Sequence, residues 1–394
     1  MAIPGWIRPL IRTTPASGRY IPALDGLRGF AVLIVLVGHG TVHGMYLYPG
    51  SDMHQIGKTG VFLFFILSSF LLTSQLLNQT QRYGATNLLM WFNYLARRFL
   101  RIFPAYVVFL LVIYLVGGRL HAWSISWHVT QQSIAMQRGV HHLWSIPVEF
   151  KFYFLLPLAL LLIVLILRRS VTATIVSMAI FVVWATQIEH LSADRDSVVN
   201  FLPTFAIGVC LAVVHRWWTT TEVKDARLVR WALEATVVGT LLFWVATIPS
   251  VWSLIVGHDV ARGYWVDHRL LFALVWAAAL FGTVHGAGYV RRVFEWQGLK
   301  VVGVISFAVY LWHPLVMLAM EPAVDDIPPQ LGLVLATAVS MAIAVASYLL
   351  IEHHWLSITL AKPQARTPSA HQSATDPATP AQPVTPLASA LPRE

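Results

Sequence analysis

The chain has 394 residues and a net charge of +9, with 57% hydrophobic and only 11% charged residues. Soluble domains carry roughly 25% charged residues, so this chain has too few charges to cover a water-exposed surface. The composition excludes an ordinary soluble protein. The positive charge does not indicate nucleic-acid binding either, because Lys and Arg form short clusters between apolar runs and no basic face.

Apolar runs long enough to cross a bilayer recur along most of the chain. A transmembrane helix needs about 20 predominantly apolar residues. The sequence predicts an all-α, polytopic transmembrane helical bundle of about ten helices, at residues 24–44, 56–77, 102–118, 148–167, 171–188, 198–215, 231–250, 270–286, 301–320 and 331–351.

The positive charges are distributed unevenly over the segments between these spans. With a cytoplasmic N-terminus, the inner segments hold 19 of the 27 Lys and Arg residues, the outer segments hold six, and Arg28 and Lys151 lie in or beside spans. Cytoplasmic loops of membrane proteins carry the excess of Lys and Arg. We therefore expect both the N-terminus and the C-terminus to be cytoplasmic.

Composition also divides the chain into three parts. Residues 1–19 are basic and lack the apolar stretch of a cleaved signal peptide, so we expect a cytoplasmic N-terminal segment. Residues 20–360 form the transmembrane domain. Residues 361–394 are rich in Pro, Ala, Thr and Ser and cannot bury enough apolar surface to fold, which predicts a disordered cytoplasmic tail.

The first predicted span contains two ionisable residues, Arg28 and His39. Such residues are costly in a bilayer and are functional candidates. Eleven residues correspond to three helical turns plus about 20°, so both side chains share one face, about 16 Å apart along the axis. A cation at the rim and an imidazole deeper in the membrane suit a long substrate that enters with its anionic end first. The alternative is a purely structural role for both residues, in which Arg28 extends its charge to the membrane surface and His39 forms a hydrogen bond between helices.

Five segments of the chain resemble the membrane acyltransferase 3 family, in the family's order. They are YIPALDGLRGFAVLIVLVGHG (20–40), FFILSSFLLT (64–73), RRFLRIFPAY (97–106), LWSIPVEFKFYFLLP (143–157) and ISFAVYLWHPLV (305–316). Ser69 stands where the family usually has Gly, and Glu352 is followed by His353-His354 where the family has Arg-Pro. The resemblance covers roughly residues 20–355.

The resemblance implies transfer of an acyl group, commonly acetyl from acetyl-CoA, to a hydroxyl of a sugar or another extracytoplasmic acceptor. It places the protein in the bacterial cytoplasmic membrane as a multi-pass enzyme. A hydroxyl that attacks a thioester needs a base, and the ordinary pKa of histidine suits that role at neutral pH. His39 is therefore the expected general base or transient acyl carrier, and Arg28 is expected to hold the donor or stabilise transition-state charge.

The three arginines at the start of the third predicted span, Arg97, Arg98 and Arg101, are the expected anchors for the CoA phosphates. Ordinary positive-inside anchoring explains the same cluster. Glu149, placed at the outer edge of the fourth span, is the expected acceptor-side or acid–base group, or else a solvated carboxylate.

Four further site candidates are polar residues within the region of resemblance. Tyr310 and His313 lie three residues apart, hence on one helical face, and Pro314 frees a backbone carbonyl beside them. Asp25 belongs to the LDGLRG segment and Glu352 ends the last span. Packing of polar groups between helices is the alternative reading of these residues.

We expect no metal site, because the adjacent pairs His141-His142 and His353-His354 lack the spacing of metal ligands. The expected partners are acyl-CoA as co-substrate, a carbohydrate or glycolipid hydroxyl acceptor and membrane lipids, and no nucleic acid. The alternative function is a transporter or flippase of a lipid-linked sugar or small solute, but the inverted repeats frequent in transporters are absent. Acceptor identity, acyl length and oligomeric state stay open.

Overall fold

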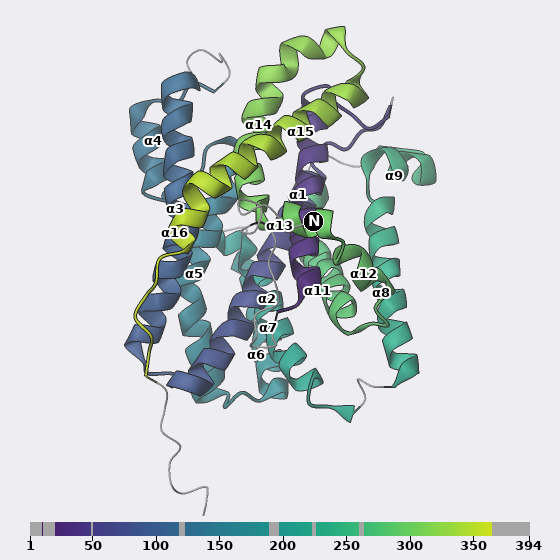
Figure 1. The fold of residues 1–394 in the computed structure, drawn as a ribbon. Coiled ribbons are helices and arrows are strands. Elements are labelled where there is room, and N and C mark those ends of the chain that lie inside the picture. The colour runs from purple at the N-terminus through teal and green to yellow at the C-terminus, as the bar shows by residue number, and fades with distance from the viewer. Residues whose placement is uncertain are drawn as a thin grey trace, which may run out of the picture.

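A computed structural model of the chain describes residues 10, 20–48, 50–117, 123–188, 197–222, 226–259 and 264–364. Nearly all of the predicted segment 1–19 and most of the tail 361–394 lie outside the described residues. The part of the chain that the structure describes contains helices and no strand (Figure 1). The predicted all-α bundle is confirmed, and in these residues nine helices are long and apolar enough to cross a membrane.

The first half of the bundle begins with its two most buried long helices. Its elements are α1 (Pro22–Val42), α2 (Gly57–Tyr83), α3 (Leu88–Val116), α4 (Trp127–Ile134), the 3₁₀ turn η3 (His141–Trp144), α5 (Ser145–Leu161) with its π-helical end η4 (Leu162–Ile166), and α6 (Val171–Ile188).

The second half alternates long helices with short ones. Its elements are η6 (Val198–Phe201), α7 (Leu202–Trp218), α8 (Arg227–Ala246), α9 (Pro249–Val256), α10 (Tyr264–Asp267), α11 (Arg269–His285), α12 (Tyr289–Phe294), α13 (Gln297–Val304), α14 (Ser306–Met320), η8 (Glu321–Asp326), α15 (Pro329–Ser347), the π-helix η9 (Tyr348–Glu352) and α16 (His353–Leu356).

Each of the ten predicted spans corresponds to a helix, with three differences. The span at 270–286 is α11, which has 17 residues and is shorter than the nine spanning helices. The span at 301–320 is broken at Ile305 between α13 and α14. The third span was predicted to begin at residue 102, but α3 begins at Leu88 and therefore includes the arginine cluster.

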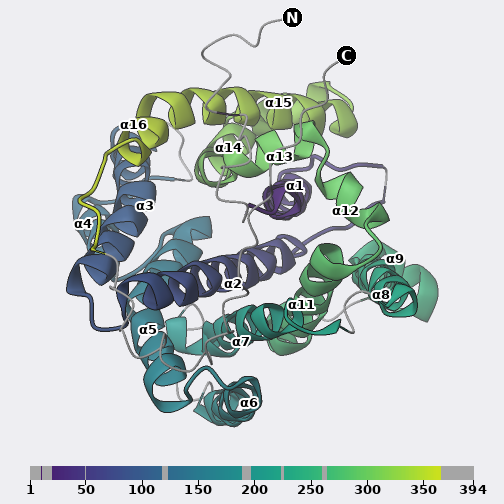
Figure 2. The same ribbon diagram turned by 60° about the horizontal axis from the view of Figure 1, so that its bottom comes forward.

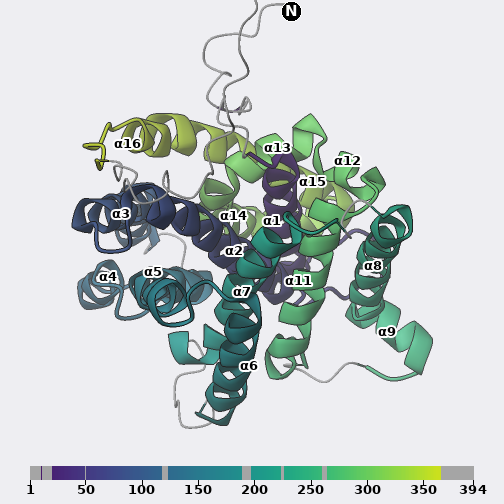
Figure 3. The ribbon, with the colours of Figure 1, turned by 90° about the horizontal axis from the view of Figure 1, so that it is seen from below.

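Helices α1 and α2 occupy the centre of the bundle, and α6 and α8 lie at its edge (Figures 2 and 3). Of the apolar stretch of each helix, 72% is buried in α1 and 78% in α2, against 17% in α6 and 11% in α8. The outward side chains of α6 and α8 include Ile180, Val183 and Leu242, all more than half exposed. Apolar side chains on that perimeter are what lipid contact requires.

Glycines bring α1 into direct backbone contact with α12 and α13. A Cβ on Gly26 would lie 1.8 Å from the carbonyl oxygen of Phe294, and one on Gly303 would lie 1.8 Å from that of Asp25. Neither position can carry a side chain unless the helices separate. The buried carboxylate of Glu234 accepts hydrogen bonds from the backbone N–H groups of Gly288 and Val290 at 2.8 and 2.5 Å, which ties α8 to the start of α12.

The bundle has two ends. The upper end in Figure 1 carries the connections α1–α2, α3–α5, α8–α11 and α14–α15, and the lower end carries α2–α3, η4–α6 and α7–α8. His39 lies in the last turn of α1, toward the upper end, and Arg28 lies eleven residues before it, toward the lower end.

Candidate active site

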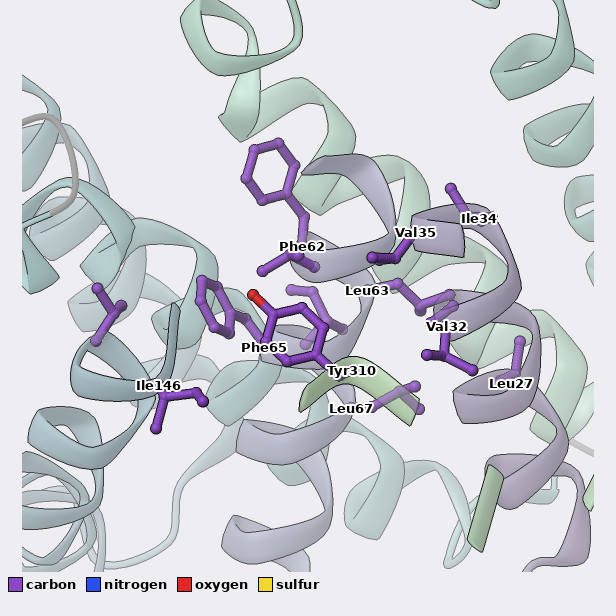
Figure 4. Close-up of a cluster of buried hydrophobic side chains, with 14 of the residues drawn as sticks. Leu27, Val32, Ile34, Val35, Phe62, Leu63, Phe65, Leu67, Ile146 and Tyr310 are labelled. Carbon is purple, nitrogen blue, oxygen red and sulfur yellow. The ribbon is translucent and has the colours of Figure 1, made fainter. Parts of the chain in front are cut away.

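A pocket lies between five helices in the interior of the bundle. Its apolar wall comes from α2, α3, α5 and α14, and its polar groups are Arg28 of α1, Arg101 of α3, Ser145, Glu149 and Tyr153 of α5, and Ser306 and Tyr310 of α14. Figure 4 shows Phe65, Ile146 and Tyr310 of this wall beside the packed side chains of α1 and α2. Two guanidinium groups and one carboxyl group thus share one apolar pocket.

Arg28 and His39 both face α14. Arg28 lines the pocket together with Ser306, Phe307 and Tyr310 of α14, and the ring of His39 lies nearly parallel to that of His313, one turn further along α14, with 4.9 Å between centroids. His39 itself does not line the pocket. It contacts His313, whose ring centroid is 6.0 Å from that of the pocket residue Tyr310.

A chain of hydrogen bonds fixes the tautomer of His39. His313 Nδ1 lies 2.9 Å from the carbonyl oxygen of Val309, which can only accept, so Nδ1 carries the proton. In a neutral His313 ring, Nε2 then accepts from His39 Nδ1, 2.7 Å away. The remaining nitrogen of His39, Nε2, therefore has the free lone pair that a general base needs.

Tyr310 links α14 to the start of α5. Its hydroxyl donates to the backbone carbonyl of His142 and lies 2.7 Å from Ser145 Oγ, which therefore donates to it. The ring of His142 lies 5.4 Å from that of Tyr310 and 5.6 Å from that of His313. A cluster of three imidazoles, His39, His142 and His313, thus adjoins the pocket.

Glu149 lies deeper than its sequence position suggested. It was predicted at the outer edge of a span beginning at 148. The continuous helical segment instead begins at His141, about 12 Å along the axis before Glu149. The hydroxyl of Tyr153 donates to Glu149 Oε1 at 2.6 Å and hydrogen-bonds Ser68. The structure therefore places Glu149 two turns inside this helical segment and in the lining of the pocket, since a 3₁₀ turn extends the helix upward beyond the apolar run.

The arginine cluster is divided among three environments. Arg101 lines the pocket, Arg98 is half-buried within electrostatic range of Tyr94 and Tyr153, and Arg97, one helical turn before Arg101, is exposed. All three lie inside α3 and not ahead of it as predicted, because the helix continues through a stretch whose charges had argued against a span.

Glu352 and Asp25 lie outside the pocket. Glu352 is 3% exposed in the π-helix η9, within electrostatic range of Arg101, and its Oε1 has no hydrogen-bond partner among the described residues. Asp25 is buried and accepts a hydrogen bond from the hydroxyl of Tyr20 at 2.5 Å. Glu352 therefore lies near Arg101 but outside the pocket, and Asp25 links the start of α1 to Tyr20.

Sequence reasoning missed His142, Ser145 and Ser306. Ser145 and Ser306 lie within matched segments and could have been found from the polar positions of those motifs. His142 was considered only together with His141, as a pair without the spacing of metal ligands. The two side chains differ in their environment, because His141 is exposed and His142 is buried. Despite the three clustered imidazoles, no group of His, Cys, Asp or Glu in the described ranges is arranged to hold a metal ion.

Long apolar helices around a buried site with arginines and histidines define a multi-pass membrane protein with a polar centre inside the bundle. The acyltransferase domain family, acyltransferase 3, matches residues 21–349, and the chain belongs to this family.

Curated relatives are similar over most of this chain. The peptidoglycan O-acetyltransferase OatA of Listeria monocytogenes is 24% identical over 86% of the chain and 56% of its own length. The putative peptidoglycan O-acetyltransferase YrhL of Bacillus subtilis is 27% identical over 85% of the chain and 54% of its length. The chain thus spans about half the length of these relatives. No solved structure matches it significantly.

Proposed function

We propose that the protein is an integral membrane O-acyltransferase of the bacterial cytoplasmic membrane, which moves an acetyl group from acetyl-CoA to a hydroxyl of a cell-envelope glycan or glycolipid. Family membership supports acyl transfer. The names of the relatives, peptidoglycan O-acetyltransferases, support acetyl as the group and a carbohydrate as the acceptor. The observation that carries the proposal is the pocket with Arg28 and Arg101, adjacent to a histidine whose Nε2 is free to act as a base.

The pocket suits the donor in both charge and polarity. Arg28 and Arg101 offer planar donor groups to phosphate oxygens, and bidentate arginine–phosphate pairs are strong. Side chains such as Phe64, Phe307 and Ile146 provide the apolar wall for a flexible pantetheine arm. The thioester would then reach Tyr310, whose ring adjoins those of His142 and His313.

In the proposed reaction, Nε2 of His39 removes the proton from the acceptor hydroxyl while its oxygen attacks the thioester carbonyl carbon. The carbon–sulfur bond breaks, and the thiolate leaves and receives the proton from His39. His313 is a positioning residue, because it holds Nδ1 of His39 in the hydrogen-bonded form and stabilises the imidazolium that forms. Direct attack on the donor needs no acyl-histidine intermediate.

Purified protein in detergent, supplied with radiolabelled acetyl-CoA and soluble peptidoglycan fragments or glycolipid acceptors, tests the proposal. The expected result is acceptor-dependent transfer of label, and a loss of about 10²–10⁴-fold in kcat for His39→Ala, the range that general base catalysis supplies. Thermal unfolding of the variant, monitored alongside, should match the wild type. Full activity in a folded His39→Ala protein would remove His39 from the mechanism. Movement of a solute in vesicles without covalent change would favour a transporter.

A further inference from the structure

His142 is a buried histidine with an unusual surrounding. It is the second residue of the 3₁₀ turn η3 and is 8% exposed. Its ring lies 5.5 Å from that of Trp123, 6.0 Å from that of Phe109 and 6.3 Å from that of His39, between centroids. Together with Tyr310 and His313, these rings enclose it on several sides.

Neither ring nitrogen of His142 has a hydrogen-bond partner among the described residues. The carbonyls of Tyr310 and Leu311 lie near the ring but outside hydrogen-bonding geometry. A neutral imidazole always carries one N–H donor and one acceptor nitrogen. Buried polar groups in native proteins are nearly always paired, so an unpaired buried imidazole next to the base points to a ligand that pairs with it.

Three features of the backbone around His142 fix the position of its buried ring. His141 has a φ of +50°, a left-handed conformation that non-glycine residues adopt at a cost and that clusters at functional sites. The hydroxyl of Tyr310 donates to the His142 carbonyl and is itself held by Ser145. Gly139 allows the turn to close, since a Cβ there would lie 2.4 Å from the Cα of Trp144.

We infer that His142 supplies the N–H donor that binds the carbonyl oxygen of the acyl group as negative charge develops on it. The inference rests on the proposed function and deepens it. His142 and His39 stand edge to face with 6.3 Å between ring centroids. A tetrahedral carbon that lies beside the two rings, and not between them, can place its attacking oxygen about 2.8 Å from one ring and its carbonyl oxygen about 2.8 Å from the other.

The step balances without any further reactant. The acceptor oxygen forms a bond to the carbonyl carbon, whose π electrons move to the carbonyl oxygen. The N–H of His142 stabilises that oxyanion and keeps its proton throughout. When the carbonyl re-forms, the carbon–sulfur bond breaks, and His39 delivers the hydroxyl proton to the sulfur. His142 thus differs from His39 in never changing its protonation state.

The test compares His142→Leu with His142→Asn, using acetyl-CoA and the acceptor assay of the wild type. The leucine variant removes the donor and fills a similar space, so kcat should fall about 10²–10³-fold, as for loss of one oxyanion donor, while KM for acetyl-CoA changes less than about threefold. The asparagine variant keeps an N–H donor and should recover at least tenfold of that loss. Because the wild-type ring is unpaired, the leucine variant should unfold at the same temperature as the wild type or higher.

Wild-type kcat in His142→Leu would overturn the inference. So would a lowered unfolding temperature together with a raised KM, because that pattern marks a packing role. Equal activity of the leucine and asparagine variants also contradicts a donor role. If the wild type transfers no acetyl group at all, the proposed function fails and the inference falls with it, whereas transfer that depends on His39 but not on His142 removes the inference alone.

Discussion

Two arginines and one glutamate face each other across an apolar pocket. Arg28 comes from α1, Arg101 from α3 and Glu149 from α5, so three separate helices must pack correctly to assemble the group. In a low-dielectric interior, fixed charges act more strongly on a ligand than they would in water. Two guanidinium groups against one carboxyl group leave the pocket suited to an anionic ligand.

Arg101 and Arg97 provide a matched pair for testing donor binding. Arg101 lines the pocket, and Arg97, one helical turn away, is exposed. Arg101→Ala removes hydrogen bonds to a charged group, which contribute about 1.5–3 kcal/mol, so KM for acetyl-CoA should rise about ten- to hundredfold. Arg97→Ala should change KM less than about twofold. Steady-state kinetics with varied acetyl-CoA measure both.

Direct binding of labelled CoA, which requires no acceptor, is the control for this comparison. Arg101→Ala should weaken it in proportion to the rise in KM. Equal effects of the two substitutions would mean that the arginines act through overall charge and not through the pocket.

At the scale of elements, the position of α1 depends on its contact with α12 and α13. Gly26 and Gly29 of α1 face the carbonyls of Phe294 and Leu299, and Gly303 of α13 faces that of Asp25. Close approach of helices through small residues is the main way in which helices associate tightly in membranes. Arg28 lies between Gly26 and Gly29 in the sequence of α1, so this contact also sets where Arg28 lies.

Gly303→Ala tests this dependence, and Gly239→Ala is its control. A Cβ on Gly303 would meet backbone at 1.8 Å, whereas nothing lies within 4 Å of a Cβ on Gly239 in α8. Overpacking costs about 1–3 kcal/mol, so Gly303→Ala should lower the thermal unfolding temperature by several degrees and reduce transfer activity. Gly239→Ala should unfold at the wild-type temperature or above, because alanine favours a helix interior over glycine. Equal unfolding temperatures for the two variants would show that α13 is not held by this contact.

Hydrophobic runs predicted the number and order of the helices but misplaced their ends where polar residues enter a helix. Because of three arginines, the third span was predicted to begin at residue 102, whereas α3 begins at residue 88. The polar turn before Ser145 likewise made the segment that carries Glu149 look shorter than it is. The shared face of Arg28 and His39 followed from helical periodicity alone. The pocket and the pairing of His39 with His313 could not follow, since they join residues 274 positions apart and depend on which helices pack together.

At the scale of the whole molecule, the site connects the two ends of the bundle. Arg28 lies toward the lower end of α1 and lines the pocket, and His39 lies toward the upper end in the cluster with His142 and His313. If the lower end faces the cytosol, the donor arrives at the arginines and the acceptor meets His39 from the other side of the membrane. Removing the three α3 arginines from the charge count leaves sixteen inner positive charges against six outer ones, so the charge distribution still predicts that the lower end faces the cytoplasm.

Single cysteines in a Cys210→Ala background test this orientation. Cys210 is the only cysteine of the chain, so its replacement gives an unreactive background. Gln137 lies exposed at the upper end, before η3, and Thr220 lies exposed at the lower end, after α7. A membrane-impermeant maleimide should label Gln137→Cys in intact cells and Thr220→Cys only after permeabilisation, because the positive charges retain the lower end in the cytoplasm. Labelling of Thr220→Cys in intact cells would reverse the orientation, and the arginine pocket would then open away from the cytosolic supply of acetyl-CoA.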